Sequence, residues 1–283
     1  MLFGTERVSP AVYRLAALFA FSPKFAKILA VKISAVIIAL NEEKNIARAI
    51  SSVEWADEIV VVDSGSTDAT RQIAAQLGAR VIEQEWLGFG RQKQFAVDAA
   101  ANDLIFSLDA DEEATQALGE EIRRTIDNGN ASAGYKIPRL AIYAGREIRH
   151  GGWYPDRQLR LFDRRKGRWS EDVIHESFRV DAGLAVGDLK SDLLHFTCEN
   201  ITEHAHMIQE RYAPLSARAM YASGKKASVL KITAAPVFSF LRDYILRAGF
   251  LDGPQGLIIA GFGAYNVFLK NALLWQMQRE HER

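Results

Sequence analysis

Three apolar, β-branched segments, each followed by acidic residues, constrain the fold of this chain more than any other feature. The segments are Ile33–Leu40, Ile59–Val62 and Leu104–Leu108. Continuous apolar runs of this length are typical of strands that are covered on both faces. Helix-forming segments lie between them, one from about Glu43 to Val53 and another from about Arg91 to Ala101. Strands that alternate with helices predict an α/β fold with a mainly parallel sheet flanked by helices.

The polar residues that follow these strands are the first candidates for a site. Ligands of parallel α/β sheets bind outside the carboxyl ends of the strands. None of the three polar segments has the glycine spacing of a dinucleotide fold or of a P-loop. Asp63 precedes a glycine turn, where it is placed to accept hydrogen bonds from a nucleobase or ribose. Asp109 and Asp111 stand two apart beyond a strand, so we expect them to converge on Mg²⁺ or Mn²⁺ together with substrate phosphates.

Each of these motifs also has a plain structural explanation. Asp63 alone fits a turn residue. Asp68 suits the N-terminus of a helix that Ser66 or Thr67 would cap. An isolated Asp-x-Asp pair is common in surface loops. The repeated order of strand and acidic segment is what favours a functional interpretation.

Charge and cysteine content limit the classes of function. The 35 basic and 35 acidic residues balance, which argues against a general nucleic-acid-binding protein. The single cysteine, Cys198, excludes a disulfide framework and a cysteine-based zinc cluster, and it fits a reducing compartment. The balance conceals two basic ends, because residues 1–32 and 206–283 both carry more Lys and Arg than Asp and Glu. Basic ends around an acidic centre predict surfaces with different partners.

Both ends of the chain also combine basic and apolar residues. In residues 1–31, Pro23 and basic side chains interrupt an apolar run, which favours an amphipathic interfacial segment over a spanning helix or a signal peptide. Residues 200–283 are expected to form a helical appendage whose basic, aromatic stretch from Lys225 to Phe250 lies on anionic lipid. The apolar run Leu257–Leu269 is too short to span a bilayer comfortably. Helices that pack on the central domain remain the alternative at both ends.

Three motifs in the central domain, residues 32–199, resemble a known family. They are "VIIALNEEKNI", "VVDSGSTDAT" and "LIFSLDADE", and together they are similar to family 2 glycosyltransferases with the GT-A fold over roughly residues 33–178. The resemblance implies a transferase that uses a nucleotide-sugar, usually a UDP-sugar, with inversion at the anomeric carbon. It also implies a set of donor-site residues: Leu40, Asn41 and Glu42 around the nucleoside, Asp63 at the base or ribose, Asp109 at the ribose or metal, Asp111 at the metal, and Lys93 against the nucleotide-sugar.

Two later segments carry a narrower resemblance. "GGWYPDRQLRLFDRRKGRWSEDVIHESF" and "FLRDYILRAGFLDGPQGL" are similar to lipopolysaccharide core β-glucosyltransferases. That similarity implies transfer of a hexose, typically glucose from UDP-glucose, to a heptose of the inner core on lipid A. It also implies a cytoplasmic enzyme that is peripheral on the inner face of the inner membrane. The basic, aromatic ends of the chain suit such an anionic, amphiphilic acceptor.

Inverting transfer to a hydroxyl requires a base for the acceptor proton and neutralisation of the departing diphosphate. The narrower resemblance nominates Glu176 as the base, and many family 2 enzymes place theirs where Asp172 stands. We rank Glu176 first. His175 is a candidate metal ligand or diphosphate contact. Arg160 is preferred to Arg157 as a phosphate contact, because strand residues three apart face opposite ways.

Other side chains receive weaker assignments. Trp153 and Tyr154 are expected to stack on sugar or to shape the acceptor cleft, although aromatic residues beside a Gly-Gly turn also simply pack. His204 and His206 are expected to face solvent. Two other functions stay open: transfer to a capsule intermediate or a protein, and sugar-nucleotide binding without transfer. The intact carboxylates of the predicted site argue against loss of activity.

Overall fold

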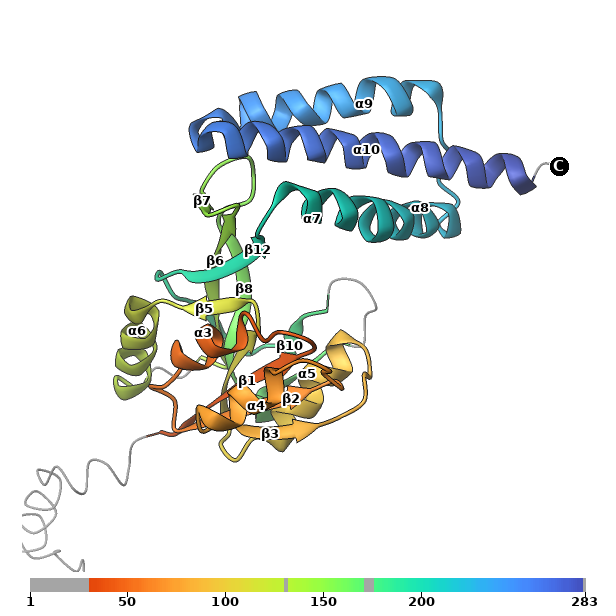
Figure 1. Ribbon diagram of the computed structural model, residues 1–283. Helices are drawn as coiled ribbons and strands as arrows, with labels where there is room; N and C mark the ends of the chain where they lie inside the picture. Colours follow the sequence, from red (N-terminus) through yellow and green to blue (C-terminus); the bar gives the residue numbers. More distant parts are fainter. Residues whose placement is uncertain (1–30, 130–131, 171–175, 282–283) are drawn as a thin grey trace, which may run out of the picture.

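A computed structural model describes residues 31–129, 132–170 and 176–281 (Figure 1). The predicted N-terminal segment, apart from Val31, therefore lies outside the described residues. Asp172 and His175 also lie outside them.

A ten-stranded sheet forms the core, with the strand order β3-β2-β1-β4-β8-β6-β12-β5 and with β7 and β11 paired to β6. Its first four strands run parallel: β1 (Ile33–Ala39), β2 (Glu58–Asp63), β3 (Arg80–Glu83) and β4 (Leu104–Asp109). The predicted parallel α/β core is confirmed. The register aligns Ala39 with Asp63 and Ile38 with Asp109, so three strand ends meet at one edge of the sheet.

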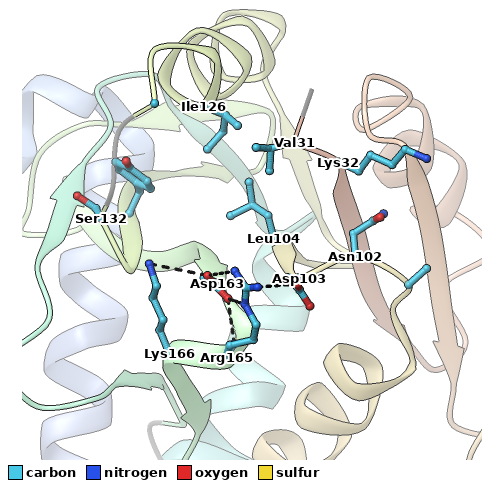
Figure 2. A pocket seen from close by; sticks show the side chains of 13 residues that line it. Val31, Lys32, Asn102, Asp103, Leu104, Ile126, Ser132, Asp163, Arg165 and Lys166 are labelled. Carbon is cyan, nitrogen blue, oxygen red and sulfur yellow. Dashed lines mark hydrogen bonds and ion pairs between the residues drawn. The ribbon is translucent and has the colours of Figure 1, made fainter. Parts of the chain in front are cut away.

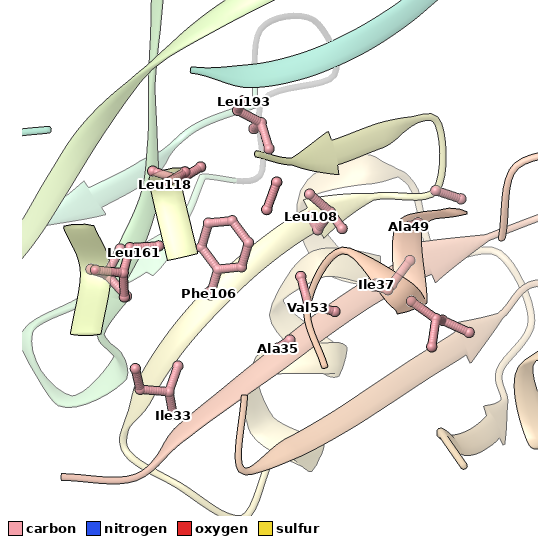
Figure 3. Close-up of a cluster of buried hydrophobic side chains, with 14 of the residues drawn as sticks. Ile33, Ala35, Ile37, Ala49, Val53, Phe106, Leu108, Leu118, Leu161 and Leu193 are labelled. Carbon is pink, nitrogen blue, oxygen red and sulfur yellow. The ribbon is translucent and has the colours of Figure 1, made fainter. Parts of the chain in front are cut away.

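Alternation along the strands assigns side chains to two buried layers. On one face, Ile37 and Phe106 pack under Ala49, from α3 (Ile46–Ser51), and Leu118, from α6 (Gln116–Asp127) (Figure 3). On the other face, Val36 and its neighbours pack against α5 (Phe89–Ala99), while α4 (Thr70–Gln76) follows β2. Burial of each such aliphatic or aromatic side chain contributes about 1.5–3 kcal/mol, which explains why these strands are the most apolar part of the sequence.

The second half of the sheet is largely antiparallel. β4 pairs with β8 (Asp156–Asp163), which pairs with β6 (Gly134–Tyr143), and β12 (Leu193–Cys198) joins β6 to β5 (Glu112–Ala114). The remaining short elements are β7 (Arg146–Ile148), β11 (Val186–Asp188), the 3₁₀ turn η1 (Arg164–Lys166) and a separate β9–β10 pair (Gly167–Trp169 and Phe178–Val180). β6, β8 and β12 extend from the parallel half toward the C-terminal helices (Figure 1).

The C-terminal region is helical from Ile201 onward. α7 (Ile201–His206), the π-helical η2 (Met207–Tyr212) and α8 (Ala213–Ala222) form the layer nearest the sheet. α10 (Gly253–His281) crosses above them, and α9 (Val229–Leu241) lies outermost (Figure 1). The π-helical η3 (Arg242–Leu246) and the 3₁₀ turn η4 (Gly249–Asp252) connect α9 to α10. The helical appendage expected from the sequence is therefore present, and α10 is longer than the predicted apolar run.

Buried polar contacts fasten this region to the sheet. Asp252, which is buried, accepts a hydrogen bond from the His150 backbone N–H at 2.8 Å and contacts its Nδ1 at 2.8 Å. Tyr143 Oη lies 3.0 Å from Nδ1 of His204. The prediction that His204 faces solvent is wrong, because its ring packs among Tyr143, Trp153 and Phe262, and this burial lowers the pKa of the imidazole.

One helical stretch among the described residues, Gly249–Glu280, is long and apolar enough to cross a membrane by length and composition, with a mean hydropathy of 1.5. In the structure this stretch, which includes η4 and α10, packs along α8 and α9. The outer helices nevertheless leave large apolar side chains exposed, among them Leu230, Phe238 and Leu246.

Candidate active site

Two loops meet at the carboxyl edge of the parallel strands. Ser66 joins them, because its hydroxyl accepts a hydrogen bond from the Asn41 N–H at 2.8 Å and donates one to Asp63. Asn41 in turn accepts one from the Thr67 N–H at 2.8 Å. Asn41 has a φ of 55°, a left-handed conformation that asparagine tolerates better than most residues. The backbone that follows β1 is therefore held in one conformation by the loop that follows β2.

Asp63 is fully buried and holds its own turn. Its Oδ1 accepts hydrogen bonds from the N–H groups of Gly65 at 3.1 Å and of Ser66 at 2.8 Å. Gly65 has a φ of 96°, which only glycine adopts readily. The arrangement matches the turn-residue alternative, so contact with a base or ribose stays a prediction. Ser66 and Thr67 do not cap α4 as predicted, since Asp68 accepts the hydrogen bond from the Thr70 N–H at 3.0 Å.

A line of alternating charges crosses the site behind Asp109. The Asp109 carboxylate contacts Lys93 Nζ at 2.9 Å and Arg160 Nη2 at 2.7 Å. Arg160 Nη2 also lies 2.6 Å from Glu112, whose other oxygen accepts a hydrogen bond from the Asp109 N–H at 3.0 Å. Arg139, 3.2 Å from Glu112, continues the line to Asp156. We refer to Lys93, Asp109, Glu112, Arg139 and Arg160 as the charge cluster.

Burial and charge act in opposite directions on these groups. Burial alone would raise the pKa of Asp109, but the Arg160 guanidinium and the Lys93 ammonium outweigh it and hold that pKa well below its usual range. Burial would lower the pKa of Arg160, and the Asp109 and Glu112 carboxylates raise it instead. Both groups are therefore ionised at neutral pH, as buried ions with close partners must be.

The position of Arg160 differs from the sequence-based prediction. Its side chain is only 4% exposed, and its Nη2 is committed to two carboxylates, so it supports Asp109 and does not face open space for a diphosphate. Arg157, three residues earlier, is 40% exposed and pairs with Asp188, as the alternation of β8 requires. The sequence correctly predicted that Arg157 and Arg160 face opposite sides of the strand. It did not predict that the carboxylates of Asp109 and Glu112 surround Arg160 on the buried side.

Glu176 reaches the same cluster from the other side. Its Oε1 lies 3.3 Å from Lys93 Nζ, so one buried ammonium bridges Glu176 and Asp109. Lys93 also lies 5.0 Å from the centroid of the Trp169 ring. Glu176 and Asp109 are far apart in the sequence, and no spacing rule would have paired them.

Asp111 has a contact of its own on β12. Its Oδ2 lies 3.3 Å from Nε2 of His195, a β12 residue that the sequence analysis did not consider. Glu42 lies close enough to Asp111 for the two carboxylates to interact. Burial raises the pKa of Glu42, a hydrogen bond from Asn45 opposes that rise, and the Asp111 and Asp68 carboxylates add to it. Carboxylates that destabilise one another's charge favour a cation between them.

This part of the site fits a divalent ion of the Mg²⁺ or Mn²⁺ type. The half-exposed carboxylate of Asp111 and the imidazole of His195 are suitable donors. Within the described ranges, no three such side chains converge as a ready-made metal cage. An ion here would take few protein ligands and would complete its shell with water or phosphate oxygens. Asp109 fits less well than predicted, since Lys93 and Arg160 already neutralise it.

The other predicted residues occupy different surroundings. Leu40 is exposed at the end of β1. The Trp153 ring packs edge-on to Tyr143, with centroids 6.0 Å apart, beneath the C-terminal helices. Tyr154 donates a hydrogen bond from Oη to Asp192 at 2.9 Å, while Arg149 lies over its ring. These contacts favour the packing alternative for both aromatic residues, and their place in an acceptor cleft stays a prediction.

A hollow of about 480 Å³ lies at the opposite end of the strands (Figure 2). Lys32, Asn102 and Leu104 line it together with Asp163 and Arg165. Part of its charge is paired internally, since Arg165 pairs with Asp163 at 2.8 Å and with Asp103 at 3.0 Å. This hollow is therefore separate from the carboxylates at the strand ends.

Comparisons with known proteins identify the family of the chain. Residues 34–183 match the family model "Glycosyl transferase family 2". The chain is 32% identical over 251 residues to "Lipopolysaccharide core biosynthesis glycosyltransferase LpsC" of Rhizobium meliloti (strain 1021), which covers 86% of this chain and 92% of that protein. It is 33% identical over 253 residues to an "Uncharacterized glycosyltransferase" of Rickettsia felis, covering 86% of this chain and 89% of that protein.

Among solved structures, glucosyl-3-phosphoglycerate synthase from Mycobacterium tuberculosis, crystallised with Mn²⁺, UDP-glucose and phosphoglyceric acid, is 29% identical with a TM-score of 0.35. The match covers 40% of this chain and 45% of that one, which is less than half of either.

Proposed function

The chain belongs to the glycosyl transferase family 2 and is a glycosyltransferase with an α/β core of the GT-A type and a helical C-terminal appendage, and from this premise we propose its reaction. It transfers a hexose, glucose from UDP-glucose, to a heptose of the lipopolysaccharide inner core with inversion at the anomeric carbon. The relative from Rhizobium meliloti, which is named for lipopolysaccharide core biosynthesis, supports the acceptor class. The donor sugar is proposed from the sequence resemblance.

The observation that carries the chemistry is the Lys93 bridge between Glu176 and Asp109. Glu176 is the proposed base, which accepts the proton of the acceptor hydroxyl as the new bond forms. Lys93 keeps that carboxylate beside the charge cluster. Asp172 remains the competing base, and it lies outside the described residues.

The departing diphosphate needs positive charge, and the donor side of the site offers a place for it. Asp111 and His195 would hold the divalent ion, with His175 as a further predicted ligand outside the described residues. When bound, the ion neutralises the leaving diphosphate. Arg160 and Glu112 keep Asp109 in place behind the donor and leave the front of the strand ends free.

We also place the enzyme on the cytoplasmic face of the inner membrane, as a peripheral protein. The support is the outer helical surface, where apolar side chains are exposed beside Lys225, Lys226 and Lys231. Basic residues beside apolar ones are the pattern with which helices bind anionic lipid surfaces. The alternative, a soluble helical layer, would bind no vesicles.

A donor screen with purified protein tests the reaction. Release of UDP is measured with UDP-glucose, UDP-galactose and other UDP-sugars, with Mn²⁺, and with lipopolysaccharide truncated at the inner-core heptoses. We expect turnover with UDP-glucose and a mass gain of one hexose on the core oligosaccharide. Turnover only with a capsule intermediate or a protein would refute the acceptor. Donor binding without turnover for any acceptor would indicate a binding protein instead.

A further inference from the structure

An exposed aromatic surface begins one helical turn from the charge cluster. Phe89 and Lys93 are four residues apart on α5, so they share a face of that helix. Phe89 packs edge-on to Trp86, with ring centroids 4.7 Å apart, and Leu87 stands between them in the sequence. All three side chains are exposed. Gly88, with a φ of 91°, makes the turn between Leu87 and the start of α5 at Phe89.

The helical region completes this surface from the opposite side. The Arg211 guanidinium, on η2, lies 5.5 Å from the Phe89 ring centroid and 6.0 Å from that of Tyr212. Arg211 and Tyr212 are exposed, and in the part of the chain that the structure describes Arg211 has no carboxylate partner. We call Trp86, Leu87, Phe89, Arg211 and Tyr212 the aromatic patch.

A hollow of about 590 Å³ opens between α5 and β9, and Leu87 is the residue of the aromatic patch that lines it. Trp169 forms part of its wall. Trp169 also lies near Lys93, so the hollow and the aromatic patch both adjoin the bridge between Asp109 and Glu176. Exposed apolar side chains gathered on one surface typically mark a binding site.

We propose that the aromatic patch binds the saccharide of the acceptor next to the sugar that is glycosylated, with Arg211 facing an anionic substituent such as a phosphate. Aromatic rings offer flat apolar faces to sugar rings. An arginine without a carboxylate partner recognises phosphate through paired donors. This inference rests on the proposed function, and it moves the acceptor site from Trp153 and Tyr154 to the start of α5.

The test uses a deacylated, heptose-containing core oligosaccharide in two forms, phosphorylated and enzymatically dephosphorylated. Binding is measured by calorimetry and transfer by donor turnover, for the full chain and for Trp86→Ala, Phe89→Ala and Arg211→Met. Leu77→Ala is the control, because Leu77 is an apolar residue that is 41% exposed, comparable with the 37% of Phe89, but lies after α4. Melting temperatures confirm that each exposed substitution leaves the fold intact.

We expect each aromatic substitution to raise the acceptor Kd and KM about fivefold, as loss of one ring contact does, while the donor KM stays within about twofold. Arg211→Met should weaken only the phosphorylated form. Unchanged acceptor constants in all three variants, or a parallel rise in the donor KM, would overturn the aromatic patch and leave the proposed reaction intact. Patch-dependent binding without transfer by the unmodified protein would support the patch and refute the reaction. No binding of either oligosaccharide would overturn the patch.

Discussion

Replacement of Arg160 by methionine removes the central cation of the charge cluster with little change in volume. Arg160 Nη2 contacts Asp109 at 2.7 Å and Glu112 at 2.6 Å, and the Glu112 side chain is fully buried. Loss of one partner from a buried ion pair costs about 3–5 kcal/mol, because a charge is left without compensation. Asp109 keeps Lys93 and Glu112 keeps Arg139, so we take the lower end, about 3 kcal/mol.

The same substitution should change how stability depends on pH. Burial would raise the pKa of Asp109, and Arg160, followed by Lys93, lowers it below its unfolded value. A carboxyl group with a depressed pKa stabilises the fold above its unfolded pKa, and that contribution is lost as the pH falls. Without Arg160 much of the contribution is absent at every pH. The difference in unfolding free energy between the two proteins should therefore narrow as the pH falls below about 5.

Urea unfolding followed by tryptophan fluorescence, at pH 7 and at lower pH, measures both effects. Arg157→Met is the matched control, because it lies on the same strand, is 40% exposed and pairs with Asp188 at 3.2 Å. An exposed pair of this kind contributes about 0–1 kcal/mol. Equal small losses in the two variants, or a difference that widens on acidification, would refute the account of the charge cluster.

Four further outcomes are expected. Glu176→Gln should lower kcat by about 10²–10⁴-fold while calorimetric donor binding persists, and a fully active variant would transfer the role to Asp172. Asp111→Ala should abolish activation in a Mn²⁺ titration of turnover, and near-normal rates would contradict a metal role there. Burial lowers the pKa of His204, so the fold favours its neutral form and should lose unfolding free energy as the pH falls from 7 to 5. His204→Phe should abolish that loss in urea unfolding, and an unchanged dependence on pH would contradict this. Replacement of Lys225, Lys226 and Lys231 by Glu should reduce the fraction of protein that sediments with anionic vesicles, since each basic residue contributes about 1 kcal/mol near a lipid surface. Equal sedimentation of the variant and the unmodified protein would exclude an electrostatic anchor at these residues.

The parallel half of the fold was predictable because its signal is local. A strand buried on both faces must be apolar throughout, and the change to acidic residues marks its end, as Asp63 and Asp109 show. The antiparallel half was not predicted. The pairing of β4 with β8 joins residues more than 40 positions apart, and short half-exposed strands carry no comparable pattern.

The sequence indicated which residue types belong to the site, but it did not indicate which of them contact one another. Asp109 and Lys93 were both assigned to the donor site, but their ion pair depends on how α5 crosses the sheet. His195 was missed because it contacts Asp111 across 84 positions of the sequence. His204 was wrongly placed in solvent, since its own helix is mostly polar and only the neighbouring elements bury it.

Glu112 receives contacts from strands β4, β6 and β8 at once, through the Asp109 N–H, Arg139 and Arg160. A substitution of any one of Glu112, Arg139 and Arg160 leaves a buried charge without its partner. We therefore expect substitutions at these positions to occur together. In an alignment of homologous sequences, we expect the residues at the positions of Glu112, Arg139 and Arg160 to covary. The residue at the position of Arg157 should vary independently of them.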